Sequence, residues 1–163
     1  MNKLVLLLLV GSLCAASAQA ETRKGNIPEG VWVLNQARSH KLQPTEQVLW
    51  IIKDDGKELI WVSVETDAQK KIVVSSWSGP YDAAPIAATG TGALNQLTSR
   101  APGIVRNYGE VPNVGSYDED CVVMAKGKRM KCTGVFRTPQ GAQNYVEDFD
   151  WTGPGPRPDP IRK

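Results

Sequence analysis

Short apolar runs separated by turn-forming residues dominate the chain from about residue 30 onward. The runs are rich in Val, Ile, Trp, Tyr and Thr, and very little of this region repeats with a helical period. Pairs such as Asp55-Gly56, Gly79-Pro80 and Lys126-Gly127 interrupt them. The pattern predicts strands at residues 30–35, 47–53, 57–66, 70–77, 92–98, 104–109, 121–125, 128–136 and 143–151.

Many short strands joined mainly by tight turns predict an all-β fold. We expect a single antiparallel up-and-down meander that closes into a barrel of about eight to nine strands. Closure removes the unpaired strand edges on which β-proteins aggregate. The barrel is expected to span residues 30–151, after an extension at residues 21–29 and before a Pro-rich, disordered tail at residues 152–163.

The stretch from Val48 to Val62 predicts one hairpin register. If Asp55-Gly56 forms a two-residue turn, Trp50 faces Trp61 across the hairpin and Lys53 meets Glu58 as a favourable charge pair. Both faces of this hairpin are apolar. We therefore expect it to be covered on the outside as well as packed on the inside.

A turn at Pro139-Gln140 predicts the register of the last hairpin. One face then carries matched charges and the other is mostly apolar. The charged pairs are Arg129 with Asp150 and Lys131 with Asp148, and the apolar face holds Met130 with Phe149 and Gly134 with Tyr145. This register also places Glu147 on the inner face, opposite Cys132, unless a bulge turns it outward or it lies at a wet barrel mouth.

The first twenty residues have the features of a secretory signal peptide. Lys3 precedes an apolar run from Leu4 to Val10, and Ala18-Gln19-Ala20 forms an A-x-A cleavage pattern. This run is too short to span a membrane, and no other apolar run approaches that length. Cleavage after Ala20 leaves 163 − 20 = 143 residues, and predicts a periplasmic or secreted protein with no membrane span.

Charge and cysteine content narrow the classes of partner. Without Lys3 the chain has 18 basic and 17 acidic residues, and no basic stripe stands out, so nucleic acid is excluded as an expected partner. Cys121 and Cys132 predict a disulfide in an oxidising compartment, because their spacing matches no zinc pattern. A turn at Lys126-Gly127 sets the two cysteines opposite each other, through either a two-residue or a four-residue loop.

Several short stretches carry a family resemblance. Gly30-Val31-Trp32 in the first strand is similar to the G-x-W signature of lipocalins and related calycin barrels. The chain also resembles small secreted lipocalin-like proteins of Gram-negative bacteria, mostly without an established function. The matching stretches are residues 30–35 with Arg38-Ser39, residues 47–56, residues 77–82 and residues 127–130. The resemblance implies a barrel with Trp32 closing one end, and an arginine, Arg129 or Arg137, packed on it.

No catalytic or cofactor motif is present in the sequence. His40 is the one histidine and is expected in an exposed loop, while Asp54-Asp55 is explained by a turn. The acids at residues 118–120 are expected in a solvated loop. We therefore predict no metal site, no cofactor and no catalytic residue.

The candidate ligand-binding residues are the aromatic and acidic side chains on the predicted inner face. These are Trp50, Trp61, Trp77, Tyr145 and Glu147. Barrels of this size are either filled by such side chains or hold one small ligand among them. The first hypothesis is a non-catalytic protein that binds a small apolar ligand. The alternatives are an envelope module that binds proteins through its loops, such as a hydrolase inhibitor, and a cofactor-free isomerase or cyclase that uses Glu147 or a tyrosine in the cavity.

Overall fold

The computed structural model describes residues 25–40, 45–67 and 69–155. The expected signal peptide and most of the expected tail lie outside these residues. The strands are β1 (Gly30–Leu34), β2 (Thr45–Asp54), β3 (Glu58–Asp67), β4 (Ile72–Pro80), β5 (Ile86–Ala87), β6 (Leu94–Ala101), β7 (Ile104–Val111), β8 (Gly115–Met124), β9 (Arg129–Thr138) and β10 (Gly141–Gly153). Two 3-10 helices, η1 (Gln36–Arg38) and η2 (Ala125–Gly127), lie between strands.

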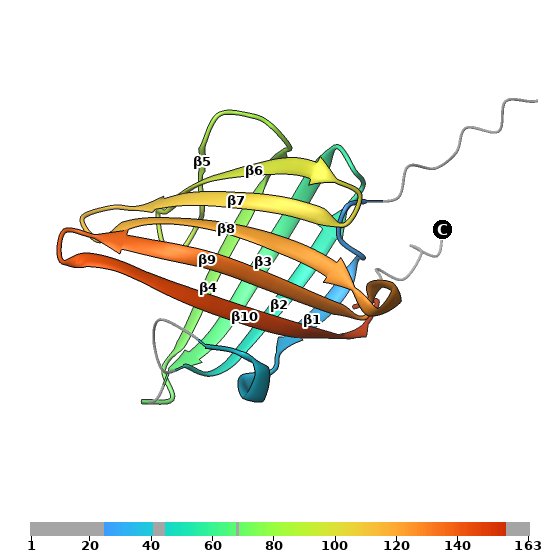
Figure 1. The fold of residues 1–163 in the computed structure, drawn as a ribbon, viewed down its shortest axis with the longest axis horizontal. Helices are drawn as coiled ribbons and strands as arrows, with labels where there is room; N and C mark the ends of the chain where they lie inside the picture. The colour runs from blue at the N-terminus through green and yellow to red at the C-terminus, as the bar shows by residue number, and fades with distance from the viewer. Residues whose placement is uncertain (1–24, 41–44, 68, 156–163) are drawn as a thin grey trace, which may run out of the picture.

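The strands form one antiparallel sheet that curls into a nearly closed barrel. The sheet order is β4-β3-β2-β1-β10-β9-β8-β7-β6-β5, so consecutive strands pair with each other except β4 and β5, which are the two ends of the sheet, and β1 also pairs with β10. Figure 1 shows the two halves, β1–β4 and β6–β10, crossing each other at a steep angle. Ser76 of β4 and Thr89, which follows β5, exchange two backbone hydrogen bonds. These bonds join the two ends of the sheet. The predicted meander is confirmed, with ten strands rather than eight to nine; the two-residue β5 is too short to be recognised from a pattern.

The last hairpin has the predicted register. Asp150 pairs with Arg129, Asp148 with Lys131 and Glu147 with Cys132. The disulfide between Cys121 and Cys132 is also confirmed. The loop before β9 has four residues, and the two cysteines lie opposite each other with their Cα atoms 3.9 Å apart.

The predicted register of the β2–β3 hairpin is wrong by two residues. Trp50 pairs with Ser63, and Lys53 pairs with Ile60 rather than with Glu58. The turn is centred one residue later than expected, on Gly56-Lys57, because Asp55 Oδ1 accepts hydrogen bonds from the N–H groups of Lys57 and Glu58. Since the slip is even, no side chain changes face.

The Asp54 carboxylate anchors this turn from inside the barrel. Its side chain accepts hydrogen bonds from the backbone N–H groups of Gly56 and Ile27, both at 2.8 Å, and from the Tyr81 hydroxyl at 2.6 Å. Asp54 is 3% exposed, so these three donors replace the water that a carboxylate otherwise needs. Ile27, ahead of the first strand, thereby becomes part of the core.

Strand β8 begins six residues before the predicted start at residue 121. The acids at residues 118–120 therefore lie in a strand, and the expectation of a solvated loop is wrong. Asp118 faces outward and is paired with Arg106 on β7, whereas the neighbouring Glu119 is buried inside the barrel. Strand alternation thus gives adjacent carboxylates opposite environments.

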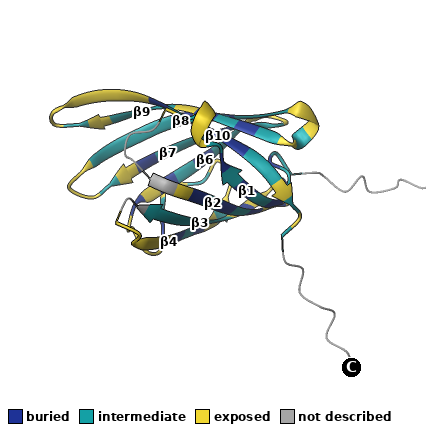
Figure 2. Cartoon of the chain, turned by 90° about the horizontal axis from the view of Figure 1, so that it is seen from below, coloured by how far each residue is buried: buried dark blue, intermediate teal, exposed yellow. Residues whose placement is uncertain are grey.

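Burial follows the strand period on most of the barrel, as Figure 2 shows. The core holds Trp32, Met130 and Phe149, each 0% exposed. The apolar outer face of the β2–β3 hairpin was expected to be covered, and this is wrong for Ile60 of β3, which is 47% exposed, beside Ile72 of β4 at 64%. No described residue covers these two side chains fully.

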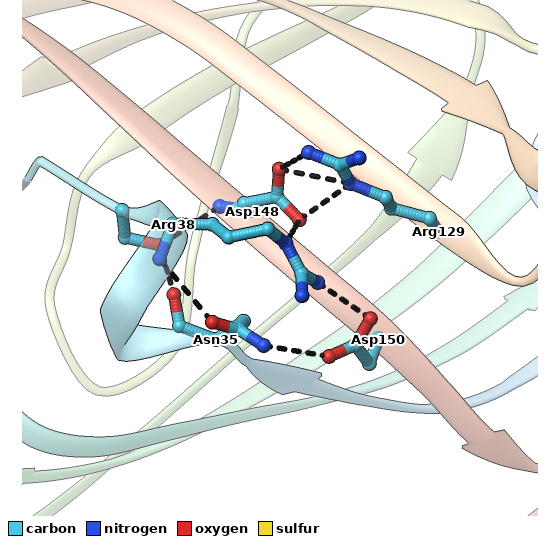
Figure 3. A network of polar contacts seen from close by, with 6 residues as sticks. Asn35, Arg38, Arg129, Asp148 and Asp150 are labelled. Atoms are coloured by element: carbon cyan, nitrogen blue, oxygen red, sulfur yellow. Dashed lines mark hydrogen bonds and ion pairs between the residues drawn. The ribbon is translucent and has the colours of Figure 1, made fainter.

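A network of ion pairs ties η1 to β10 (Figure 3). Arg38 and Arg129 both donate from Nε to Asp148 Oδ1 at 2.9 Å, and the Asp148 side chain is only 1% exposed. Arg38 also pairs with Asp150, which accepts a second hydrogen bond from Asn35. The β9–β10 register matches the prediction, but the Arg129 side chain reaches diagonally to Asp148.

Replacing Asp148 with asparagine is expected to lower the free energy of unfolding by roughly 1–3 kcal/mol at neutral pH, after allowance for screening of the partly exposed guanidinium groups. Burial alone would raise the pKa of Asp148, but hydrogen bonds from Arg129 and Arg38 outweigh it and the pKa is lowered. Its stabilising contribution is therefore present above the unfolded pKa of about 3.9 and is lost as pH falls through the folded value. Urea unfolding from neutral to acid pH tests this. Asp82→Asn, at an exposed turn, is the control; a loss that does not change with pH would contradict the account.

Candidate ligand-binding cavity

Two adjoining chambers lie inside the barrel. The inner one has a volume of about 40 Å³ and apolar walls that include Leu59, Leu97 and Val105. The wider one has a volume of about 270 Å³ and more polar walls. The residues common to both linings are Trp50, Trp61, Asn95, Asn107 and Glu119. The barrel is therefore neither fully packed nor lined by apolar groups alone.

Three tryptophans from neighbouring strands build one wall. Trp50 stacks on Phe149 with ring centroids 3.9 Å apart, and meets Trp61 edge to face at 5.5 Å. Trp77 lies beside Trp61 in the β3–β4 register and donates its indole N–H to the Ile86 carbonyl. The stacked and hydrogen-bonded contacts fix Trp50 and Trp77, so this wall is rigid before any ligand arrives.

Glu119 is the central polar group of the cavity. It is 6% exposed and lines both chambers. Asn107 donates to one of its carboxylate oxygens at 2.9 Å and the Tyr145 hydroxyl donates to the other at 3.1 Å. Burial raises the pKa of Glu119, and these two hydrogen bonds oppose that shift.

Two glycines make room for the tyrosines of the wide chamber. A Cβ on Gly134 would lie 2.5 Å from Tyr145 Cζ and 2.8 Å from Glu119 Cβ, so only glycine lets the Tyr145 ring cross β9 and reach Glu119. Tyr117 lies over Gly109 on β7 in the same way, and its hydroxyl bonds to Asn95. Rings laid over strand glycines restore the packing that the missing side chains would give.

Two further glutamates line the wide chamber, Glu65 from β3 and Glu147 from β10. Both are partly exposed. Glu65 accepts a hydrogen bond from Ser63 at 3.0 Å. Glu147 faces the interior as the last hairpin predicts, at a more solvated position than Glu119.

Within the described part of the chain, two buried polar atoms of the lining have no hydrogen-bond partner. They are Trp61 Nε1, a donor, and Asn107 Oδ1, an acceptor. Both residues line both chambers. Leaving such groups unpaired costs roughly 1–3 kcal/mol each, so water or a ligand at this point would be stabilised by them.

The structure places all five sequence-predicted residues on the cavity wall. Trp77 lines the inner chamber, Tyr145 and Glu147 line the wide one, and Trp50 and Trp61 line both. Sequence reasoning missed several polar lining residues, among them Glu65, Asn95, Asn107, Tyr117 and Glu119. One signal was available for Glu119: continuing the Cys121–Cys132 register by two residues pairs it with Gly134, on the inner face.

The remaining candidates are structural or exposed. His40 is exposed, and its backbone pairs with Val146. Among the described residues, Glu119, Cys121 and Cys132 bring possible metal-ligand atoms within 4.8 Å of one another. The two sulfurs are bonded to each other, so they offer no thiolate and this group does not form a metal centre. Of the described helices, neither is long and apolar enough to cross a membrane.

Comparison with known proteins identifies the fold but no matching sequence family. No family model matches the chain, and no curated protein sequence does. A solved structure described as a Schistosoma mansoni fatty acid binding protein in complex with arachidonic acid superposes with a TM-score of 0.58 and 12% sequence identity. The match covers 81% of this chain and 99% of that one. The chain thus has a calycin-like β-barrel fold, the architecture that the G-x-W resemblance implies.

Proposed function

We propose that this protein is a periplasmic or secreted binding protein that holds a small, mainly apolar ligand inside its barrel without reacting with it. The observation that carries the proposal is the wide chamber of about 270 Å³ beside the Trp50–Trp61 pair. Ligand pockets in proteins typically measure about 300–1,000 Å³, so a small ligand fits this space. A fatty acid binding protein of the same fold supports an apolar cargo.

The location outside the cytoplasm is part of this proposal. It is supported by the leader-like sequence at residues 1–20 and by the Cys121–Cys132 disulfide, which persists in oxidising compartments. The two alternatives, a loop-mediated hydrolase inhibitor and a cofactor-free isomerase or cyclase, stay predictions. For the isomerase, Glu119 rather than Glu147 is the better-placed acid, because burial raises its pKa.

Titration with octan-1-ol, a neutral apolar probe, is expected to change tryptophan fluorescence saturably and to raise the melting temperature. The fluorescence changes because Trp50 and Trp61 form the wall; the melting temperature rises because binding to the folded state alone stabilises it, by about 2.7 kcal/mol at a hundred times Kd.

Ala93 directly precedes β6, is 5% exposed and lines the wide chamber. The substitution Ala93→Phe therefore fills this chamber and is expected to abolish both the fluorescence change and the rise in melting temperature. Ala142→Phe makes the same change at an exposed position on β10 and should leave them intact. Wild-type protein that shows neither response, or Ala93→Phe protein that binds as tightly as wild type, would refute the proposal.

A further inference from the structure

The charged side chains described in the cavity lining are all acidic. Its ionisable carboxyl groups are Glu65, Glu119 and Glu147, and none of the described residues lining either chamber is Lys, Arg or His. The arginines of the ion-pair network around Asp148, Arg38 from η1 and Arg129 from β9, line neither chamber. Among the described residues of the two linings, an anionic headgroup therefore meets no basic side chain.

The three glutamates act at one place. Burial raises the pKa of the Tyr117 phenol, and the charges of Glu119, Glu147 and Glu65 raise it further. Burial and the charge of Glu119 likewise raise the pKa of Tyr145. The three carboxyl groups, which come from β3, β8 and β10, line the same wide chamber, in agreement with their shared effect on this phenol.

This space offers hydrogen-bond acceptors to a ligand. Each oxygen of Glu119 receives one hydrogen bond and retains a free lone pair. Asn107 Oδ1, beside it, is buried and has no partner. An N–H-bearing group at this point would bond to both, whereas a carboxylate would add a like charge in a desolvated site.

The aromatic wall also favours a cationic ligand over an anionic one. A cation is attracted to the faces of Trp rings within about 6 Å, most strongly where water is excluded. Trp50 and Trp61 line both chambers, next to Glu119. The free Trp61 Nε1–H provides one donor for an acceptor elsewhere on the ligand.

We infer that the cavity selects small amines: an apolar body with an amino group held by Glu119, Asn107 Oδ1 and the glutamates of the wide chamber. This inference rests on the proposed binding function and specifies its ligand class. It separates this barrel from the fatty acid binding protein with which it shares a fold, because a fatty acid's carboxylate is the headgroup that the lining disfavours.

A matched series of eight-carbon probes tests the inference. Octylamine, octan-1-ol and octanoate are titrated at neutral pH with tryptophan fluorescence as the readout. Octylamine is expected to bind roughly tenfold or more tighter than octan-1-ol, and octanoate weakest. Glu119→Gln should reduce the preference for the amine over the alcohol several-fold, as should Glu147→Gln, which serves if the first variant does not fold. Glu58→Gln removes the same charge at an exposed site on β3 and should keep the full preference.

The outcomes distinguish a failure of the proposed binding function from a failure of the amine preference alone. If none of the probes binds, the proposed function fails and the amine inference with it. If octan-1-ol or octanoate binds as tightly as octylamine, the binding function stands and the amine inference is overturned. An amine preference that survives in both glutamine variants would also overturn it, since the carboxyl groups would then not be its cause.

Discussion

Replacing Trp32 with alanine is expected to lower the free energy of unfolding by about 3–5 kcal/mol, the largest loss that we predict for a single substitution. Trp32 is 0% exposed, and its indole N–H donates to the Pro28 carbonyl at 3.0 Å. It lies on β1 between Trp50 of β2 and Trp151 of β10. Removing the ring leaves a void where the first and last strands meet, and the barrel depends on that seam for closure.

Phenylalanine variants of two tryptophans distinguish the tightly packed core from the cavity wall. Trp32→Phe loses the hydrogen bond and part of the ring, and we expect a loss of roughly 2 kcal/mol. Trp61→Phe makes the same change on the cavity wall, where the indole N–H has no partner, so its effect should stay within roughly 1 kcal/mol. Urea unfolding of the two variants measures the contrast. Equal losses would mean that the interior beside Trp61 is as tightly packed as that around Trp32.

Replacing Glu119 with glutamine is expected to stabilise the protein at neutral and alkaline pH. Because burial raises the pKa of Glu119, the folded state holds its proton more tightly than the unfolded chain. The stabilisation that comes from this tighter proton binding is complete below the unfolded pKa of about 4.3. It is lost as pH rises through the pKa of Glu119 in the folded state. Between these two values the wild type loses about 1.4 kcal/mol per pH unit, and the glutamine variant does not.

Unfolding free energies measured from about pH 4 to about pH 9 test this sign. The groups that act on Glu119 are Asn107 and Tyr145, which hydrogen-bond to it, and the charges of Asp118 and Asp120. They are unchanged in the variant, so the difference between the two proteins should grow with pH and then level off. Glu58→Gln, at an exposed position, should follow the wild-type curve. A wild-type–variant difference that is constant with pH would show that Glu119 does not titrate in the barrel interior.

The accuracy of the hairpin predictions depended on how local the determining contacts are. The β9–β10 register was predictable because its turn and its alternating charges and apolar residues lie within the hairpin itself. The β2–β3 register was not, because the local hydrogen bonds to Asp55 act together with those that Asp54 accepts from Ile27 and Tyr81, each 27 residues away in the sequence. The distant part of this arrangement cannot be read from the residues of the turn.

The candidate site was predictable only in part. Trp50, Trp61 and Trp77 were identified as large aromatic side chains on the predicted inner face, because such side chains are mostly buried. Glu119 was missed because three adjacent acids resemble a solvated loop, although the disulfide register extended by two residues places it inside. Whether the interior is filled or hollow depends on side-chain packing across the barrel, to which distant strands contribute, and strand patterns do not encode it.

The indole N–H signals of the protein in ¹⁵N NMR, followed during saturation with octan-1-ol, test most directly whether a ligand enters the barrel. Tryptophan-to-phenylalanine variants assign the signals. We expect large shifts for Trp61, whose N–H is unpaired, and for Trp50 beside it. We expect little change for Trp32 and Trp151, which donate to the carbonyls of Pro28 and Glu29. An unchanged Trp61 signal at saturation, or shifts confined to Trp151, would contradict a binding cavity inside the barrel.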